Sequence, residues 1–179
     1  TMIKGMYSSA AGMIPRVKSQ ERIANNIANA TTAGFKKDKA FVRELSRAEQ
    51  RLTPSQVDWR KPVAEQTYVD YASGVFDRTD NPLDLAIEGD GFFLLQDDQG
   101  NQYLTRSGTF SVSADGILEF PNGFALIGEG GPIGVGSGTV TVSSTGEVQS
   151  DGNQVGRITP VTVPDVQALQ KTGHSLFIL

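Results

Sequence analysis

The stretch LDLAIEGDGFFLLQDDQGNQYLTRSGTFSVSADGILEFPNGFALIG, residues 83–128, decides the fold, because short apolar runs alternate in it with glycine-containing turns. Turn signals lie at 88–91, 97–101, 114–116 and 121–123. Glycine and asparagine supply the positive φ angles that such turns need. A turn about every ten residues is typical of short antiparallel strands in a sandwich or barrel.

The pattern continues toward the end of the chain. TVTVSS (139–144), EVQS (147–150) and RITPVTV (157–163) alternate as further strands. The last segment, PDVQALQKTGHSLFIL (164–179), indicates a short helix, a glycine stop and an apolar end. The fold class expected is mainly β with an N-terminal α-helix: a β-sandwich or barrel-like domain of short antiparallel strands, plus a coiled-coil-forming helical extension.

The N-terminal part, residues 2–29, has the period of an amphipathic helix. Apolar residues at heptad spacing form a seam that suits packing against another helix. The alternative is a core helix of a globular domain. Small side chains along the seam and Lys18, Glu21 and Arg22 on the opposite face favour a close helical partner. The predicted assembly seam consists of Ile3, Met6, Ala10, Met13, Val17, Ala24 and Ile27.

Pro15 lies inside this helix pattern. A proline removes one backbone donor and clashes with the preceding turn, at a cost of about 3 kcal/mol in a helix interior. The sequence therefore predicts either a kink at Pro15 or a helix that begins near it.

The helix ends in RIANNIANATTAGFKKDKAF, residues 22–41, which is unusually rich in amides. Asn29 and Gly34 can adopt the left-handed conformation that stops a helix, and Thr31 and Thr32 favour leaving it. The surplus amides can also donate and accept hydrogen bonds without adding charge, as a register lock between packed subunits. The predicted helix-end motif consists of Asn25, Asn26, Asn29, Thr32, Gly34 and Phe35.

The sequence divides into three regions: a heptad helix and stop motif at 2–35, a polar connector at 36–67, and a β domain at 68–179. The connector is rich in charge and is interrupted by Pro54 and Pro62, with a possible short helix at 38–52.

Composition excludes several classes of function. The formal net charge is −4 and no long run of Lys or Arg occurs, so nucleic acid is not an expected partner. Cysteine is absent and His174 is the single histidine, which excludes disulfides and Cys/His zinc sites. No run of 18 apolar residues is present, so the chain is not expected to span a membrane, and the N-terminus makes a poor cleaved signal peptide.

Sequence motifs for phosphate binding, metal binding or catalysis are weak in this chain. The glycines at 128–138 match no phosphate-binding pattern and suit turns. An acidic group, Asp77, Asp80, Asp84, Glu88 and Asp90, lacks the EF-hand pattern, and solvated loop carboxylates are the preferred interpretation. His174 near the chain end has no nucleophile elbow to serve and is expected at the surface. Paired carboxylates of a glycoside hydrolase stay open. We expect no enzyme, no catalytic or metal site and no cofactor.

Two stretches taken together carry a family resemblance. MIKGMYSSAAGM leading to ANNIANATTAGFKK, and NPLDLAIEGDGFFLL leading to YLTRSGTFSVSADGILEFPNGFALIG, resemble the bacterial flagellar basal-body rod and hook protein family, with rod-type members closest. Their order and spacing cover most of residues 2–130, and 155–179 more faintly. The β-domain motif consists of Asn81, Pro82, Leu83, Asp84, Gly89, Asp90, Gly91, Phe92 and Phe93.

The resemblance implies a structural axial subunit that self-assembles by helix packing and β-domain contacts into a hollow helical tube, the flagellar rod. It implies as partners the chain itself, other axial proteins, the type III export apparatus and surrounding ring proteins. The implied location is the flagellum basal body in the cell envelope, reached without a cleaved signal peptide. The alternative function is a secreted β-rich adhesion or carbohydrate-binding module, which accounts for the strands but not for the helix end.

Two departures from the family pattern stand out. The family's C-terminal helix, the usual partner of the seam, would follow the position where this sequence stops at Leu179. Pro15 also lies within what should be a continuous helix. A truncated or shortened member whose seam is satisfied by neighbouring chains is the hypothesis that follows.

Overall fold

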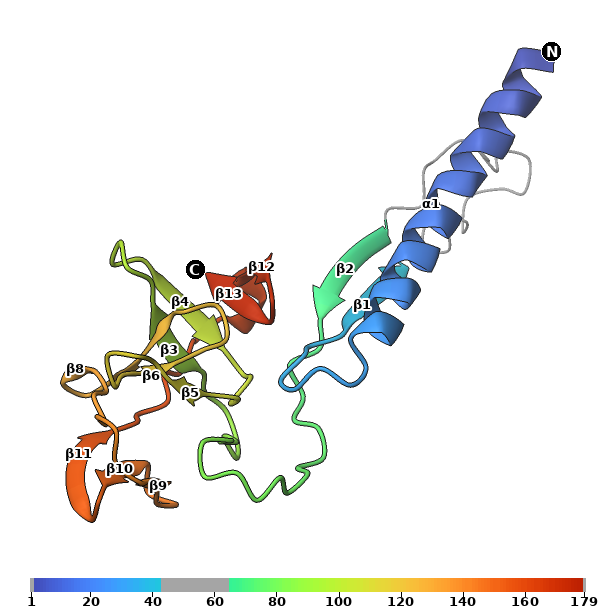
Figure 1. Cartoon of the computed structure of the whole chain (residues 1–179). Helices are drawn as coiled ribbons and strands as arrows, with labels where there is room; N and C mark the ends of the chain where they lie inside the picture. The colour runs from blue at the N-terminus through green and yellow to red at the C-terminus, as the bar shows by residue number, and fades with distance from the viewer. Residues whose placement is uncertain (1, 43–64, 179) are drawn as a thin grey trace. The chain divides into compact units, whose positions relative to one another are not determined.

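The computed structural model describes residues 2–42 and 65–178 (Figure 1). The described residues divide into two compact units, and each is described by itself. The first unit contains 2–31, 36–42 and 65–70, and the second contains 32–35 and 71–178. The domain limits predicted from the sequence stay a proposal, because a division by contacts says nothing of independent folding.

The first unit consists of one helix and a two-stranded ladder. Helix α1 (Met2–Ala28) includes Pro15 and is drawn as one unbroken ribbon in Figure 1. The prediction of a helix that begins near Pro15 is therefore wrong, since a proline removes only one donor and the neighbouring turns keep theirs. The alternative, a kink at Pro15, stays a prediction.

Strands β1 (Asp38–Val42) and β2 (Glu65–Val69) pair antiparallel, with Asp38 opposite Val69 and Val42 opposite Glu65. The short helix predicted at 38–52 is wrong over Asp38–Val42, because cross-strand pairing overrides the weak local helix signal. Residues 43–52 lie outside the described part of the chain. The connector is thus partly a β-hairpin stem, which packs against α1.

The second unit contains the antiparallel β structure expected from the sequence. Its larger sheet has the strand order β12-β13-β4-β3-β7-β6-β5, with β8 paired to β7, and it curls into a half-barrel (Figure 1). These strands are β3 (Phe93–Gln96), β4 (Gln102–Thr105), β5 (Ser111–Val112), β6 (Leu118–Glu119), β7 (Ala125–Gly128), β8 (Gly131–Pro132), β12 (Gln170–Gly173) and β13 (Leu176–Ile178).

A smaller sheet, in the order β11-β10-β9, consists of β9 (Val140–Val142), β10 (Glu147–Ser150) and β11 (Asn153–Arg157). The strand predicted at 157–163 is wrong for the most part. Pro160 has no N–H to donate, and Val161 alone forms a bridge, with Phe92. The short helix predicted near the end is a single 3-10 turn, η2 (Val166–Ala168), followed by the β12–β13 hairpin.

The core of the second unit lies between the two sheets. Buried apolar side chains from both sheets form one contiguous cluster, which makes the two sheets a single folding unit. The fold class predicted from the sequence, mainly β with an N-terminal helix, is confirmed. The cluster includes Phe93, Leu95, Phe110, Leu118, Phe120, Leu126, Ile133, Val135, Val140, Val148, Ile158 and Leu176.

Candidate functional site: the helix seam, its end and the β-domain motif

The seam of α1 is exposed in the described part of the first unit. The exposed fraction is 65% for Met13, 51% for Val17 and 70% for Ile27, and Ala24 is also exposed. These side chains recur at three- and four-residue intervals and so lie along one stripe. The side chains of the other predicted members, Ile3, Met6 and Ala10, lie outside the described residues.

Ile23 extends this stripe and was missed by the sequence reasoning. Its side chain is 53% exposed and lies one turn before Ile27. The heptad rows did not include it, although its apolar character four residues from Ile27 was a usable signal. An exposed row of isoleucines, valine and methionine is typical of a surface that packs against another helix or another protein.

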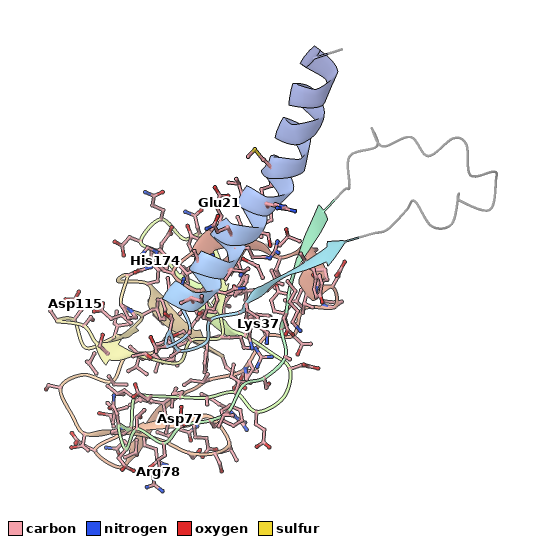
Figure 2. All side chains as sticks on the ribbon, turned by 90° about the vertical axis from the view of Figure 1, so that its right-hand side faces the viewer. Glu21, Lys37, Asp77, Arg78, Asp115 and His174 are labelled. Atoms are coloured by element: carbon pink, nitrogen blue, oxygen red, sulfur yellow. The ribbon has the colours of Figure 1, made fainter. Side chains whose placement is uncertain are left out.

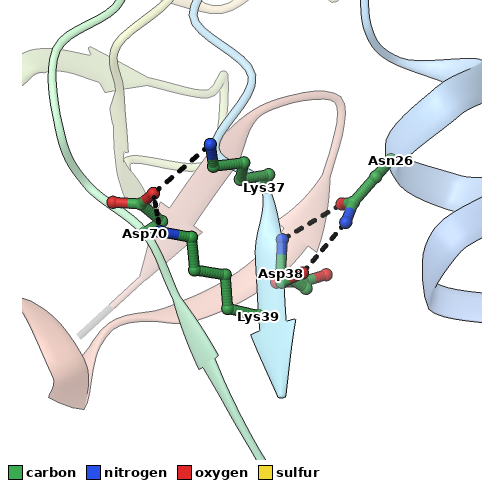
Figure 3. A network of polar contacts seen from close by, with 5 residues as sticks. All are labelled: Asn26, Lys37, Asp38, Lys39 and Asp70. Carbon is green, nitrogen blue, oxygen red and sulfur yellow. Dashed lines mark hydrogen bonds and ion pairs between the residues drawn. The ribbon is translucent and has the colours of Figure 1, made fainter. Parts of the chain in front are cut away.

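Asn26 attaches the opposite side of α1 to the hairpin (Figure 3). Its Nδ2 donates to the Asp38 carbonyl at 2.9 Å, and its Oδ1 accepts from the Asp38 N–H at 3.1 Å. Successive helix residues are about 100° apart, so Asn26 lies about 100–180° around the axis from Met13, Val17, Ala24 and Ile27. The described strands of the hairpin, Asp38–Val42 and Glu65–Val69, therefore do not cover the seam.

Asn25 and Asn29 pair with each other at the helix end. Asn29 Nδ2 donates to the Asn25 carbonyl at 2.9 Å and to Asn25 Oδ1 at 3.0 Å. Asn29 does not adopt a positive φ, so its predicted left-handed conformation is wrong; its N–H still donates to the Asn25 carbonyl, which continues the helical pattern. The asparagines thus differ: one binds the hairpin, and two complete the helix end.

Charged side chains close the base of the hairpin (Figure 3). Lys39 Nζ lies 2.8 Å and Lys37 Nζ 3.6 Å from Asp70 Oδ2, and the Asp70 N–H donates to the Lys37 carbonyl at 3.0 Å. The hydrogen bond that the Lys39 ammonium donates to the Asp70 carboxylate, together with the negative charge of that carboxylate, raises the pKa of Lys39. These ion pairs are solvent-exposed, so their contribution to stability is small.

Residues Thr32–Phe35, which we name the clip, belong to the second unit. Gly34 has φ +67°, as predicted for the helix stop, and a Cβ there would overlap the backbone of Arg106 and Ser107. The Lys171 ammonium lies 5.0 Å from the centre of the Phe35 ring. Glycine is therefore required at position 34 for two reasons, its backbone angle and the close approach of another chain segment.

The first half of the β-domain motif forms a turn that lies against the residues just before β5. Asn81 Oδ1 accepts from the Leu83 N–H at 3.2 Å, and the Leu85 N–H donates to the Gly108 carbonyl at 2.8 Å. A Cβ at Gly108 would overlap the Leu85 carbonyl oxygen. The contacts of this half are thus made within the second unit.

The second half contains the Gly89–Asp90–Gly91 turn, which Arg106 contacts from outside the motif. Arg106 Nη1 donates to the Gly89 carbonyl at 2.8 Å, and its guanidinium lies 5.2 Å from the centre of the Phe92 ring. Burial lowers the pKa of Arg106, and the Asp90 carboxylate acts in the opposite direction. Arg106 was not singled out from the sequence, and no local signal pointed to it.

Phe92 and Phe93 are both buried and point to opposite faces of the sheet. Phe92 packs edge-on with Tyr71 and Phe177 at centroid distances of 6.0 and 5.9 Å. Phe93 packs with Phe110 at 5.2 Å in the main core. Two consecutive aromatic side chains thus pack against opposite faces of the same sheet.

The described residues contain no group of three or more His, Asp or Glu side chains arranged to hold a metal ion. His174 is exposed, with φ +50°, in the turn between β12 and β13, as expected for a surface histidine. Within the described ranges no helix has the length and apolar character to cross a membrane. The candidate sites in the described part of the chain are therefore exposed surfaces that could contact other proteins.

An exposed helical seam joined to a β domain defines the layout of a self-assembling structural protein. The family model "Flagella basal body rod protein" matches residues 6–36, and the model "Flagellar hook protein FlgE/F/G D1 domain" matches residues 86–150. The chain is 33% identical to the flagellar basal-body rod protein FlgF of Caulobacter vibrioides, over 98% of this chain and 73% of that protein. The chain belongs to the flagellar basal-body rod protein family.

Two further relatives agree. The rod protein FlgG of Buchnera aphidicola subsp. Schizaphis graminum is 28% identical over 98% of this chain and 74% of its own length. The hook protein FlgE of Brucella abortus is 31% identical over 75% of this chain and 33% of its own length. The role is that of a structural axial protein of the flagellar basal body, and the comparisons give the adhesion or carbohydrate-binding alternative no support.

Proposed function

We propose that the chain assembles with copies of itself and with other axial proteins into a hollow helical tube, the flagellar rod. The seam of α1 makes the helix contacts in this tube, and the β domain makes the outer ones. The single observation that carries the proposal is the exposure of Met13, Val17 and Ile27 along one stripe while Asn26 holds the hairpin on another side.

Burial of the stripe supplies the driving force. Removing one Val, Ile or Met side chain from water contributes about 1.5–3 kcal/mol. A helix with a small-residue seam cannot bury these side chains alone and needs a second helix at close range. The described strands of the hairpin are not that partner, because they contact α1 through Asn26 on another side of the helix.

The subunit acts without catalysing a reaction and without a cofactor. It reaches the basal body through the flagellar export apparatus, lies there in the cell envelope, and is surrounded by ring proteins. The limits 2–35, 36–67 and 68–179 describe a helical assembly region, a connector and a β domain.

The residue sets keep distinct proposed roles. Asn26 fixes the hairpin to the helix, and the Asn25–Asn29 pair presents amides that set the register between packed subunits. Gly34 and Phe35 dock the clip. The β-domain motif, from Asn81 to Phe93, supports folding of the β domain rather than contact with partners.

The experiment compares polymer formation by the purified chain and two variants, followed by sedimentation and electron microscopy at rising concentration. Wild type is expected to form tubes, and Ile27→Asp to stay unassembled with an unchanged near-UV spectrum from its β domain. Lys18→Glu, which changes charge about 100–180° around the helix axis from the seam, serves as the control and should assemble. Tubes formed equally well by Ile27→Asp would overturn the proposal.

A further inference from the structure

An apolar groove lies on the second unit, on a face formed by β3, β4 and β13 together with the segment 161–164. Leu104 and Val163 are buried in it, and Thr162 is exposed beside it. Its volume is about 430 Å³, which is within the ~300–1,000 Å³ range of sites that hold a compact apolar group. The lining residues are Leu94, Gln102, Leu104, Val161, Thr162, Val163, Pro164 and Ile178.

The segment that forms one wall is held in place. Phe92 and Val161 exchange two backbone hydrogen bonds, each 2.9 Å long, at an isolated bridge. Phe92 is itself 2% exposed and packed against Phe177. The groove is therefore a built part of the domain and not a gap beside a loose segment.

The same unit presents an apolar protrusion. Val75 is 91% exposed and Phe76 is 56% exposed, on a segment without helix or strand between Tyr71 and Asn81. Both ends of this segment are anchored: Tyr71 packs on Phe92 and Phe177, and Asn81 forms the turn that begins the β-domain motif. Figure 2 labels the next two residues, Asp77 and Arg78, on this loop at the edge of the β domain.

We propose that Val75 and Phe76 of one copy insert into this groove on the next copy. The inference rests on the proposed function, because it names one contact of the polymer. A protrusion and a groove at different places on one subunit make a heterologous contact, which propagates along an open helical assembly instead of closing into a dimer. That is the symmetry an axial subunit requires.

A contact of this size suits a second copy that is already held in the polymer. One aromatic side chain buries about 150–250 Å², whereas a stable pairwise interface buries about 1,600 Å². The contact alone does not hold two copies together in dilute solution. Once the seam brings copies together, the effective concentration of the protrusion is high and the contact forms.

The absence of native cysteine allows a direct test. Phe76→Cys and Thr162→Cys are made as separate single variants of the full chain, mixed at assembling concentration and oxidised with copper phenanthroline. Mixed disulfide dimers are expected at about ten times the yield obtained with Asp115→Cys, an exposed turn residue, in place of Phe76→Cys. Equal yields from the two mixtures would overturn the inference.

A second pair of variants measures the energetic contribution. Phe76→Ser should raise the critical concentration for assembly about tenfold or more, since it removes one buried aromatic side chain. Arg78→Ala, two residues on and fully solvated, should leave it unchanged. If Phe76→Ser assembles like wild type while Ile27→Asp does not, the groove contact is overturned and the proposed function stands. A double Phe76→Cys/Thr162→Cys variant that forms its disulfide only within single chains would also overturn it.

Discussion

The carboxamide of Asn26 and the backbone of Asp38 form a reciprocal pair of hydrogen bonds, 2.9 Å and 3.1 Å long, between the last turns of α1 and the first residue of β1. An amide side chain carries a donor nitrogen and an acceptor oxygen side by side, so it can do both without adding charge. The pair imitates the exchange between two paired strands and lets a helix hold a hairpin edge.

Asn26→Ala should loosen the hairpin from the helix. Loss of two partly buried hydrogen bonds costs about 1–2 kcal/mol, which corresponds to about a 5–30-fold change in a local opening equilibrium. Amide hydrogen exchange at Asp38 measures it directly. Asn25→Ala, whose amide contacts Asn29 and not the hairpin, is the matched control and should leave the Asp38 amide protected. Equal exchange in both variants would show that the pair is not formed in solution.

Gly34→Ala should destabilise the second unit. The new methyl group requires a positive φ from alanine and overlaps the backbone of Arg106 and Ser107, for a loss of about 1–3 kcal/mol in the free energy of unfolding. Denaturant unfolding followed by aromatic fluorescence provides the measurement. Gly74→Ala is the control, since no atom lies within 4 Å of its added Cβ. An equal, small change in both variants would mean that the clip does not dock.

The stability of the β3–β4 turn should depend on pH through the carboxylate of Asp97. The Asn101 side chain, then the backbone N–H groups of Asn101 and Gln99 and the Tyr103 hydroxyl, lower the pKa of Asp97, while desolvation opposes them. A lowered folded pKa contributes stability above the ordinary aspartate value of about 4, and this stability is lost as the pH falls through the folded value. Carboxyl titration by NMR should find Asp97 below its ordinary range, and Asn101→Ala should return it toward that range. A titration unaffected by Asn101→Ala would contradict the assignment.

The parts of the fold that depend on local chemistry were predictable. Gly100, Gly116 and Gly123 have positive φ in the turns where the sequence placed them, and β10 (Glu147–Ser150) coincides with its predicted strand. The exposed stripe on α1 was predictable because helical periodicity is local, and Val17 and Ile27 are exposed; the role of this stripe in assembly stays a proposal.

The parts that depend on distant partners were not predictable. Strand β1 has a charged, short sequence, and its partner β2 begins more than twenty residues further on, so only pairing across the ladder makes it a strand. The docking of Gly34 against Ser107 and of Arg106 against Gly89 likewise joins segments whose relation no local pattern states. Glycine at position 34 was read as a helix stop, which is half of its role.

The central claim is that the seam of α1 is a contact between subunits, and thiol labelling of single-cysteine variants tests it most directly. Ile27→Cys places a thiol on the seam, and Lys18→Cys places one on the polar face of the same helix. On assembly, maleimide labelling of Ile27→Cys should slow at least tenfold, while the rate for Lys18→Cys should remain that of the unassembled chain. Equal labelling rates for Ile27→Cys before and after assembly would contradict the claim.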